Sequence, residues 1–90
     1  MKELRAIIHG RVQLVMFRDF TKRRARALGL VGVVRNLEGG TVEVVAQGEK
    51  HALEQLVEAL HRGPLLSRVD AVDTVWCEPV QKYTGFIIAY

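Results

Sequence analysis

Cysteine is almost absent from this sequence, and that absence excludes two kinds of structure. Cys77 is the only cysteine among the 90 residues, so no disulfide can form within the chain and no cysteine-rich zinc site can be built. Long apolar runs are absent too, since none approaches the ~20 residues that a membrane-spanning helix needs. Charges at residues 1–5 stand where a secretory signal would need an apolar stretch. We therefore expect a cytoplasmic protein without a membrane segment.

The chain also has little room for more than one domain. Ninety residues can enclose one small hydrophobic core. The sequence contains no internal repeat, low-complexity stretch or linker. Hydrophobic residues make up 49% and charged residues 26%, a balance typical of a folded chain and not of a disordered one. We expect a single domain over residues 1–90.

Positive charge is modest overall but concentrated in one segment. The formal net charge is +3, yet residues 17–28 alone carry +4, from four arginines and one lysine against one aspartate. Such a segment attracts a small anion or a polyanion. A solvated helix face is the explanation that we favour for most of these residues, and Arg18 is the exception considered below.

Apolar periodicity predicts five strands and two helices. Gly10 is expected to end the first strand, Gly29 to end the first helix, and Gly63-Pro64 to end the second. Residues 38–41, Glu-Gly-Gly-Thr, predict a hairpin. The predicted strands are 4–9, 31–37, 42–47, 69–76 and 86–90, and the predicted helices are 17–28 and 49–62. This β-α-β-β-α-β order with an extra strand favours an α+β fold of the ferredoxin-like (split βαβ) type, with two helices on one face of an antiparallel sheet.

The connection between the first strand and the first helix is the strongest candidate for a functional site. A loop that enters a helix can direct several backbone N–H groups at one anion, and phosphate commonly binds there. Arg18 would lie in the first helical turn, where a cation costs up to ~1 kcal/mol against the helix dipole. A bound anion would explain that placement, because the guanidinium can hold two phosphate oxygens. The alternative is an ordinary ion pair between Arg18 and Asp19 or Glu38.

Several segments in register resemble the signature of the acylphosphatase family. The resemblance covers nearly the whole chain, so it is far more specific than one glycine-containing loop. The matching segments are Gly10-Arg11-Val12-Gln13, Phe17-Arg18-Asp19-Phe20, Leu28-Gly29-Leu30-Val31-Gly32, Val34-Arg35-Asn36, Val42-Glu43-Val44 and Gly63-Pro64.

The resemblance implies a ferredoxin-like fold and a specific reaction. Acylphosphatases hydrolyse the carboxyl–phosphate anhydride of acyl phosphates without a metal or other cofactor, so we expect a small-molecule substrate and a monomeric protein. The family's phosphate-binding arginine falls on Arg18, and its water-positioning asparagine falls on Asn36. Its phosphate-binding backbone amides fall on Val12, Gln13, Leu14, Val15, Met16 and Phe17.

One departure from the family pattern bears on activity. Leu14 stands where the family usually has glycine, and a positive φ there would cost a leucine on the order of 1–2 kcal/mol. That departure keeps open an alternative, a catalytically weak module that binds phosphate or carbamoyl phosphate. We expect no appended domain beside these 90 residues, and this expectation speaks against the alternative.

A third function, RNA binding, is suggested only by the basic helix. A ferredoxin-like RNA-binding domain would carry aromatic residues of the RNP type on its sheet. The sequence contains no such motif, so we do not expect a nucleic-acid partner.

Overall fold

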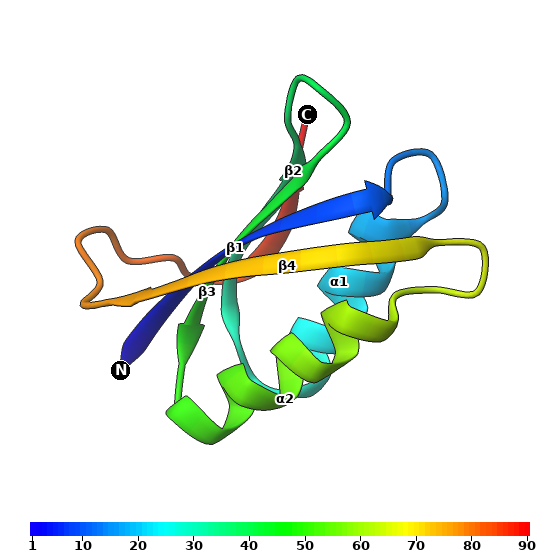
Figure 1. Cartoon of the computed structure of the whole chain (residues 1–90). Coiled ribbons are helices and arrows are strands. Elements are labelled where there is room, and N and C mark those ends of the chain that lie inside the picture. Colours follow the sequence, from blue (N-terminus) through cyan, green and yellow to red (C-terminus); the bar gives the residue numbers. More distant parts are fainter.

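The computed structural model describes all 90 residues and has two helices packed on one face of a five-stranded sheet (Figure 1). The sheet order is β4-β1-β3-β2-β5. Because β3 lies between β1 and β2, the strands that α1 connects, the predicted ferredoxin-like architecture is confirmed. The elements are β1 (Lys2–Arg11), α1 (Phe17–Ala27), β2 (Val31–Asn36), β3 (Val42–Gly48), α2 (Lys50–Arg62), β4 (Arg68–Cys77) and β5 (Phe86–Ala89).

Alternation along the strands separates a helix-covered face from an open face. The helix-covered face of β1 and β3 carries apolar side chains that pair across the two strands, as in Ala6 opposite Val44. The periodic apolar faces of α1 and α2 complete this core. The fully buried members of these four elements include Leu4, Ala6, Ile8, Phe17, Ala25, Val42, Val44, Ala46, Leu53, Leu56 and Leu60.

One strand pair departs from the antiparallel sheet expected from the sequence. β5 pairs with β2 in parallel, from Gly32 opposite Phe86 to Arg35 opposite Ala89. The reason lies in the preceding connection. β4 ends at Cys77 opposite Glu3, and residues 78–85 then cross to the far edge of the sheet at that same end. A strand that starts there must run in the direction of β2 and β1, so the sheet is mixed but mostly antiparallel.

Gly10 does not end the first strand, contrary to the sequence-based expectation. β1 continues to Arg11 and changes register against β4 between His9 and Gly10. A Cβ at Gly10, whose φ is +128°, would lie 2.1 Å from the carbonyl oxygen of Arg68. The glycine therefore permits a bulge in which two backbones come close, and the functional loop begins at Val12.

The topology gathers three chain segments at one end of the molecule. The loop after β1, the β2–β3 hairpin and the C-terminus all lie there, because β1, β2 and β5 end on the same side (Figure 1). The other end holds the N-terminus and the β4–β5 connection. Neither helix has the length and apolar content required to cross a bilayer.

Candidate functional site

The loop from Val12 to Met16 leaves its backbone N–H groups without protein partners. None of the hydrogen bonds in turns, loops and caps is donated by residues 12–18, and the first one along α1 joins Phe20 N–H to the Met16 carbonyl. Met16 precedes the helix with φ of 65° and no side-chain cap. Left-handed residues in such a turn bring successive N–H groups to one concave side, which suits an anion.

Leu14 has a positive φ. The sequence had raised this possibility, because the family usually has glycine at this position. Its φ is 61°, and Met16 is the only other non-glycine residue with a positive φ. Each costs on the order of 1–2 kcal/mol relative to an ordinary conformation. Such strain persists where the surrounding structure imposes it, commonly at a functional site. The strain at Met16 was not predictable from the sequence, because that position carries no glycine or asparagine signal.

Gln13 fastens this loop to the β2–β3 hairpin through its side chain. Nε2 donates hydrogen bonds to the carbonyl oxygens of Leu37 at 2.9 Å and Thr41 at 2.8 Å. The sequence had suggested only a backbone role for Gln13. The side chain couples the loop to the hairpin that begins directly after Asn36.

Asn36 presents a buried acceptor that no protein group satisfies. It is the last residue of β2 and shares the helix-covered face with Val34, two residues earlier. Its Oδ1 is the only buried side-chain nitrogen or oxygen atom without a hydrogen-bond partner. An orphaned buried acceptor costs about 1–3 kcal/mol, so this oxygen is suited to accept a hydrogen bond from a water or ligand.

Arg18 forms none of the ion pairs that would have made it an ordinary surface residue. Asp19, one expected partner, instead pairs with Arg23 at 3.0 Å and Lys22 at 3.9 Å. The Arg18 guanidinium carbon lies 4.8 Å from the ring centre of Tyr90. The guanidinium is therefore supported by an aromatic face, while its donors are free to bind an anion.

Tyr90 connects Arg18 with the end of the sheet at which Asn36 lies, but Asn36 does not line the adjacent cavity. The parallel ladder ends at Arg35 and Ala89, so Asn36 and Tyr90 leave the sheet side by side, and the Tyr90 ring reaches Arg18. A cavity of about 450 Å³ opens here between the loop, the start of α1 and the end of β5. Its lining residues are Val12, Leu14, Met16, Phe17, Arg18, Asp19, Lys22, Ile88 and Tyr90.

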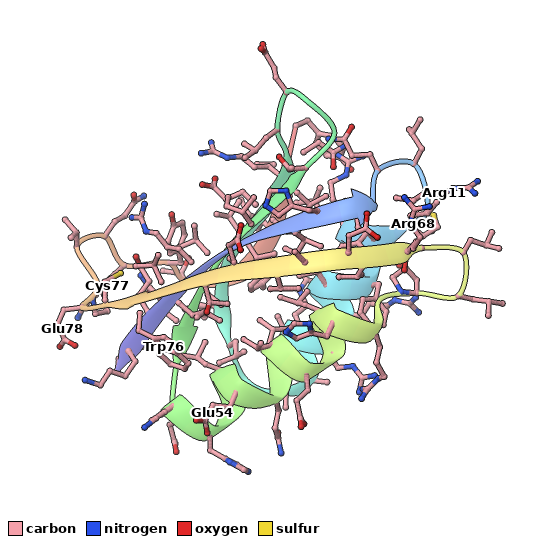
Figure 2. All side chains as sticks on the ribbon, viewed as in Figure 1. Arg11, Glu54, Arg68, Trp76, Cys77 and Glu78 are labelled. Carbon is pink, nitrogen blue, oxygen red and sulfur yellow. The ribbon has the colours of Figure 1, made fainter.

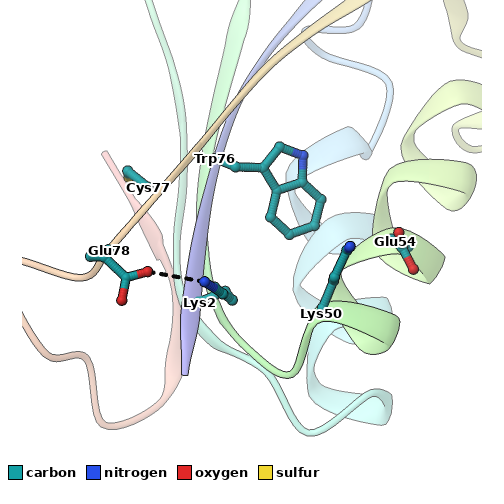
Figure 3. Close-up of a pocket in the computed structure, with 6 residues that line it drawn as sticks. All are labelled: Lys2, Lys50, Glu54, Trp76, Cys77 and Glu78. Atoms are coloured by element: carbon teal, nitrogen blue, oxygen red, sulfur yellow. Dashed lines mark hydrogen bonds and ion pairs between the residues drawn. The ribbon is translucent and has the colours of Figure 1, made fainter.

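A second cavity lies at the opposite end and lacks these features (Figures 2 and 3). Trp76 faces α2 there, and the rim is charged, with Lys2 bonded to Glu78 at 3.3 Å. Cys77 borders the cavity and donates a hydrogen bond to Glu3. That hydrogen bond, together with burial, raises the pKa of the Cys77 thiol, so the thiol is a poor nucleophile. The end with Arg18 and Asn36 is the better candidate site.

Comparisons with known proteins agree with this geometry. The family model described as Acylphosphatase matches residues 4–88. A protein of Salinibacter ruber named Acylphosphatase is 48% identical over 85 residues, covering 94% of this chain and 90% of that protein. The crystal structure of acylphosphatase from Bacillus subtilis superposes with a TM-score of 0.97 at 36% identity and covers all of both chains.

A longer protein contains a segment of the same shape. The crystal structure of HypF from T. kodakarensis matches with a TM-score of 0.87 and 32% identity. The match covers 99% of this chain but only 12% of that one. The fold is therefore found both as a small acylphosphatase and as part of a much larger protein.

Proposed function

The chain belongs to the acylphosphatase family, and we propose that it hydrolyses the carboxyl–phosphate bond of acyl phosphates, releasing a carboxylate and inorganic phosphate. The observation that carries the proposal is the arrangement around the loop. The loop with unpaired N–H groups lines one cavity through Val12, Leu14, Met16 and Phe17, and Arg18, which has no ion-pair partner, lines the same cavity. We further propose that no metal or other cofactor takes part, that the protein acts as a monomer, and that it acts in the cytoplasm.

Phosphate binding is assigned to the loop and Arg18. The N–H groups of Val12 to Phe17 would donate to the phosphate oxygens, and the Arg18 fork would hold two of them. Each charge-assisted hydrogen bond contributes on the order of 1.5–3 kcal/mol. Because guanidinium groups are not deprotonated in proteins, this binding needs no protonation step on the protein.

Asn36 is assigned to the attacking water. Its orphaned Oδ1 would accept a hydrogen bond from that water and align it with phosphorus. A carboxamide is too weak a base to take the proton, so we assign the proton to a phosphate oxygen of the substrate. The water oxygen bonds to phosphorus, the bond from phosphorus to the acyl oxygen breaks, and its electron pair leaves on the carboxylate.

These few groups are sufficient because an acyl phosphate already has a good leaving group. The phosphoryl transition state requires alignment of the entering and leaving oxygens and stabilisation of charge on the equatorial ones. Donors that are fixed before the substrate arrives provide this stabilisation without reorganisation. A rigid loop that fastens to the hairpin through Gln13 meets that requirement.

The direct test is hydrolysis of benzoyl phosphate, followed against its spontaneous decay. We expect the wild-type protein to accelerate the reaction and the Arg18→Ala and Asn36→Ala variants to lose most of this acceleration. Decay at the spontaneous rate beside folded wild-type protein would refute the proposal, as would variants that are as fast as wild type.

The second candidate function is a phosphate- or carbamoyl-phosphate-binding module with little turnover. The backbone strain at Leu14 and the likeness to a segment of a longer protein favour it. Carbamoyl phosphate distinguishes the two functions. Tight binding without measurable hydrolysis of carbamoyl, acetyl or benzoyl phosphate would support the module.

A further inference from the structure

We propose that the cavity beside the loop is an apolar acyl-binding site, so that this protein prefers acyl phosphates with longer aliphatic or aromatic acyl groups over acetyl and carbamoyl phosphate. The inference rests on the proposed function and adds a substrate class to it. It concerns Leu14, Met16 and Tyr90, which line the cavity. Leu14 and Met16 have no assigned side-chain role in the chemistry, and Tyr90 has only the support of Arg18.

Covalent connectivity determines where the acyl group must lie. One bridging oxygen separates the acyl carbon from phosphorus, so a phosphate held by the loop and Arg18 places the acyl group within a few ångströms of them. The cavity of about 450 Å³ that Arg18 and the loop side chains line is the hollow in contact with this point. Its volume is large for acetyl alone and lies within the range of small-molecule sites.

Six of the nine residues that line this cavity are apolar or aromatic, beside the charged Arg18, Asp19 and Lys22. Leu14 is 96% exposed, Met16 69% and Tyr90 99%, and the partly buried Ile88 lies behind them. Single exposed apolar residues are common, but several around one cavity mark a place where a ligand covers them. An alkyl or aryl chain is the ligand chemistry that gains most from such contacts.

Two of these apolar residues, Leu14 and Met16, have a strained backbone conformation. Leu14 and Met16 are the only non-glycine residues with positive φ, and a glycine at position 14 would remove its share of the strain. Because strained apolar residues flank the phosphate-binding groups, we infer that contact with the acyl group compensates for the strain.

The charges in the cavity do not favour an acyl group that carries a second anion. Lys22 and Asp19 pair with each other at 3.9 Å, and Asp19 also holds Arg23. Arg18 is committed to the phosphate in the proposed function. The cavity therefore offers no further free cation to a second carboxylate or phosphate.

The test is a homologous series of acetyl, butyryl and hexanoyl phosphate. The three leaving carboxylates have nearly equal basicity, so differences in kcat/KM report contacts with the chain and not leaving-group reactivity. Full burial would give about fourfold per methylene, and half-burial about twofold. We expect hexanoyl phosphate to exceed acetyl phosphate by roughly tenfold.

Two variants assign this preference to the cavity walls. Met16→Gln keeps the chain length, and Leu14→Asn introduces a residue that tolerates positive φ. Each should reduce the hexanoyl advantage about threefold. Val80→Gln is the matched control, because Val80 is 93% exposed in the β4–β5 connection at the other end, and it should leave the ratio unchanged.

The outcomes separate the two proposals. Hydrolysis of all three substrates at one kcat/KM, or an advantage that both cavity variants retain, would overturn the acyl-binding site while leaving the proposed function standing. Hydrolysis of none of them would overturn the proposed function and this inference with it.

Discussion

In the proposed function, Arg18 binds the phosphate group and Asn36 aligns the attacking water. Substitutions of these two residues should therefore affect phosphate affinity and kcat differently. Replacing Arg18 with alanine removes two charge-assisted hydrogen bonds, so phosphate affinity and turnover should both fall, by roughly 100-fold or more. Replacing Asn36 with alanine removes the alignment of water, so kcat should fall by about 100-fold while phosphate affinity changes little. Calorimetric titration with phosphate and steady-state kinetics measure the two effects. Equal losses of phosphate affinity in both variants would contradict this division.

Gln13 is predicted to act as a positioning residue for both of these groups. Gln13→Leu removes two hydrogen bonds and leaves the Leu37 carbonyl unpaired, whereas the Thr41 carbonyl keeps its hydrogen bond from the Leu37 N–H. The loss should cost about 1–3 kcal/mol of stability. The loop would no longer be fixed relative to Asn36, so kcat should fall more than tenfold with a smaller change in KM. Gln55→Leu, on the exposed surface of α2, is the control for a general effect of the substitution. A Gln13→Leu variant that is destabilised but retains wild-type kcat would show a purely structural role.

At the residue scale, local position in the sequence predicted a role for Arg18, whereas Asn36 was predicted only through the resemblance to the acylphosphatase family. The sequence also suggested a positive φ at Leu14, and the structure has one. It could not indicate the side-chain role of Gln13 or the support of Arg18 by Tyr90, because those contacts join residues 28 and 72 positions apart. Contacts of this kind depend on how the strands are ordered, which local patterns do not encode.

Among the elements, β1 depends on the glycine that allows its bulge. Gly10→Ala would place Cβ 2.1 Å from the Arg68 carbonyl oxygen, so β4 must move and the loop after Arg11 must shift with β1. We predict a loss of several kcal/mol of stability, on the scale of overpacking and strain together, and reduced activity in the protein that remains folded.

Gly29→Ala is the matched control for that substitution. Gly29 also has a positive φ, of +73°, but nothing lies within 4 Å of an added Cβ. The Gly29→Ala substitution should therefore lower the free energy of unfolding only by the conformational penalty of about 1–2 kcal/mol. Chemical denaturation compares the two variants, and equal destabilisation would refute the close approach at Gly10.

The β4–β5 connection is held to the sheet by a buried polar cluster around Glu3. Glu3 is 2% exposed and accepts hydrogen bonds from Gln47, Arg5 and Cys77. Gln47 also bonds to the backbone of Gln81 and Tyr83. Burial alone would raise the pKa of Glu3, but these hydrogen bonds together lower it below its ordinary value of 4.5.

This lowered pKa predicts a dependence of stability on pH. The folded protein favours ionised Glu3 more than the unfolded chain does, so the stabilisation is complete above pH 4.5 and is lost as the pH falls below it. Urea unfolding at pH 6 and pH 3 measures this dependence. Between the two pH values, the free energy of unfolding should fall less for Glu3→Gln than for the wild-type protein. Glu58→Gln, on the exposed face of α2, should follow wild type. If the free energy of unfolding of Glu3→Gln fell as much as that of the wild-type protein, Glu3 would not be the source of the pH dependence.

At the element scale, the sequence predicted where helices and strands occur but not how one edge strand runs. The 3.6-residue periods and the helix-ending glycines gave both helices to within one residue at either end. The direction of β5 depends on the path of residues 78–85, which carry no periodicity, and Gly10 gave the same local signal as a strand-ending glycine. Both errors concern backbone paths that only the paired strand determines.

At the scale of the whole molecule, the ferredoxin-like topology gathers the functional groups at one end. β1, β2 and β5 all end there, which brings together the loop, Asn36 and Tyr90 (Figure 1). The second cavity, at Trp76, lies at the other end (Figure 3). A phosphate ion should distinguish these two ends without any need for turnover.

The most direct measurement is the titration of the backbone amide NMR signals of the wild-type protein with inorganic phosphate. We predict saturable shifts confined to the amides of residues 12–18 and their neighbours at Asn36, and their loss in Arg18→Ala. Shifts centred on Trp76 and Lys50, or no saturable shift in the loop at millimolar phosphate, would contradict the central claim that this loop and Arg18 together bind the phosphate group.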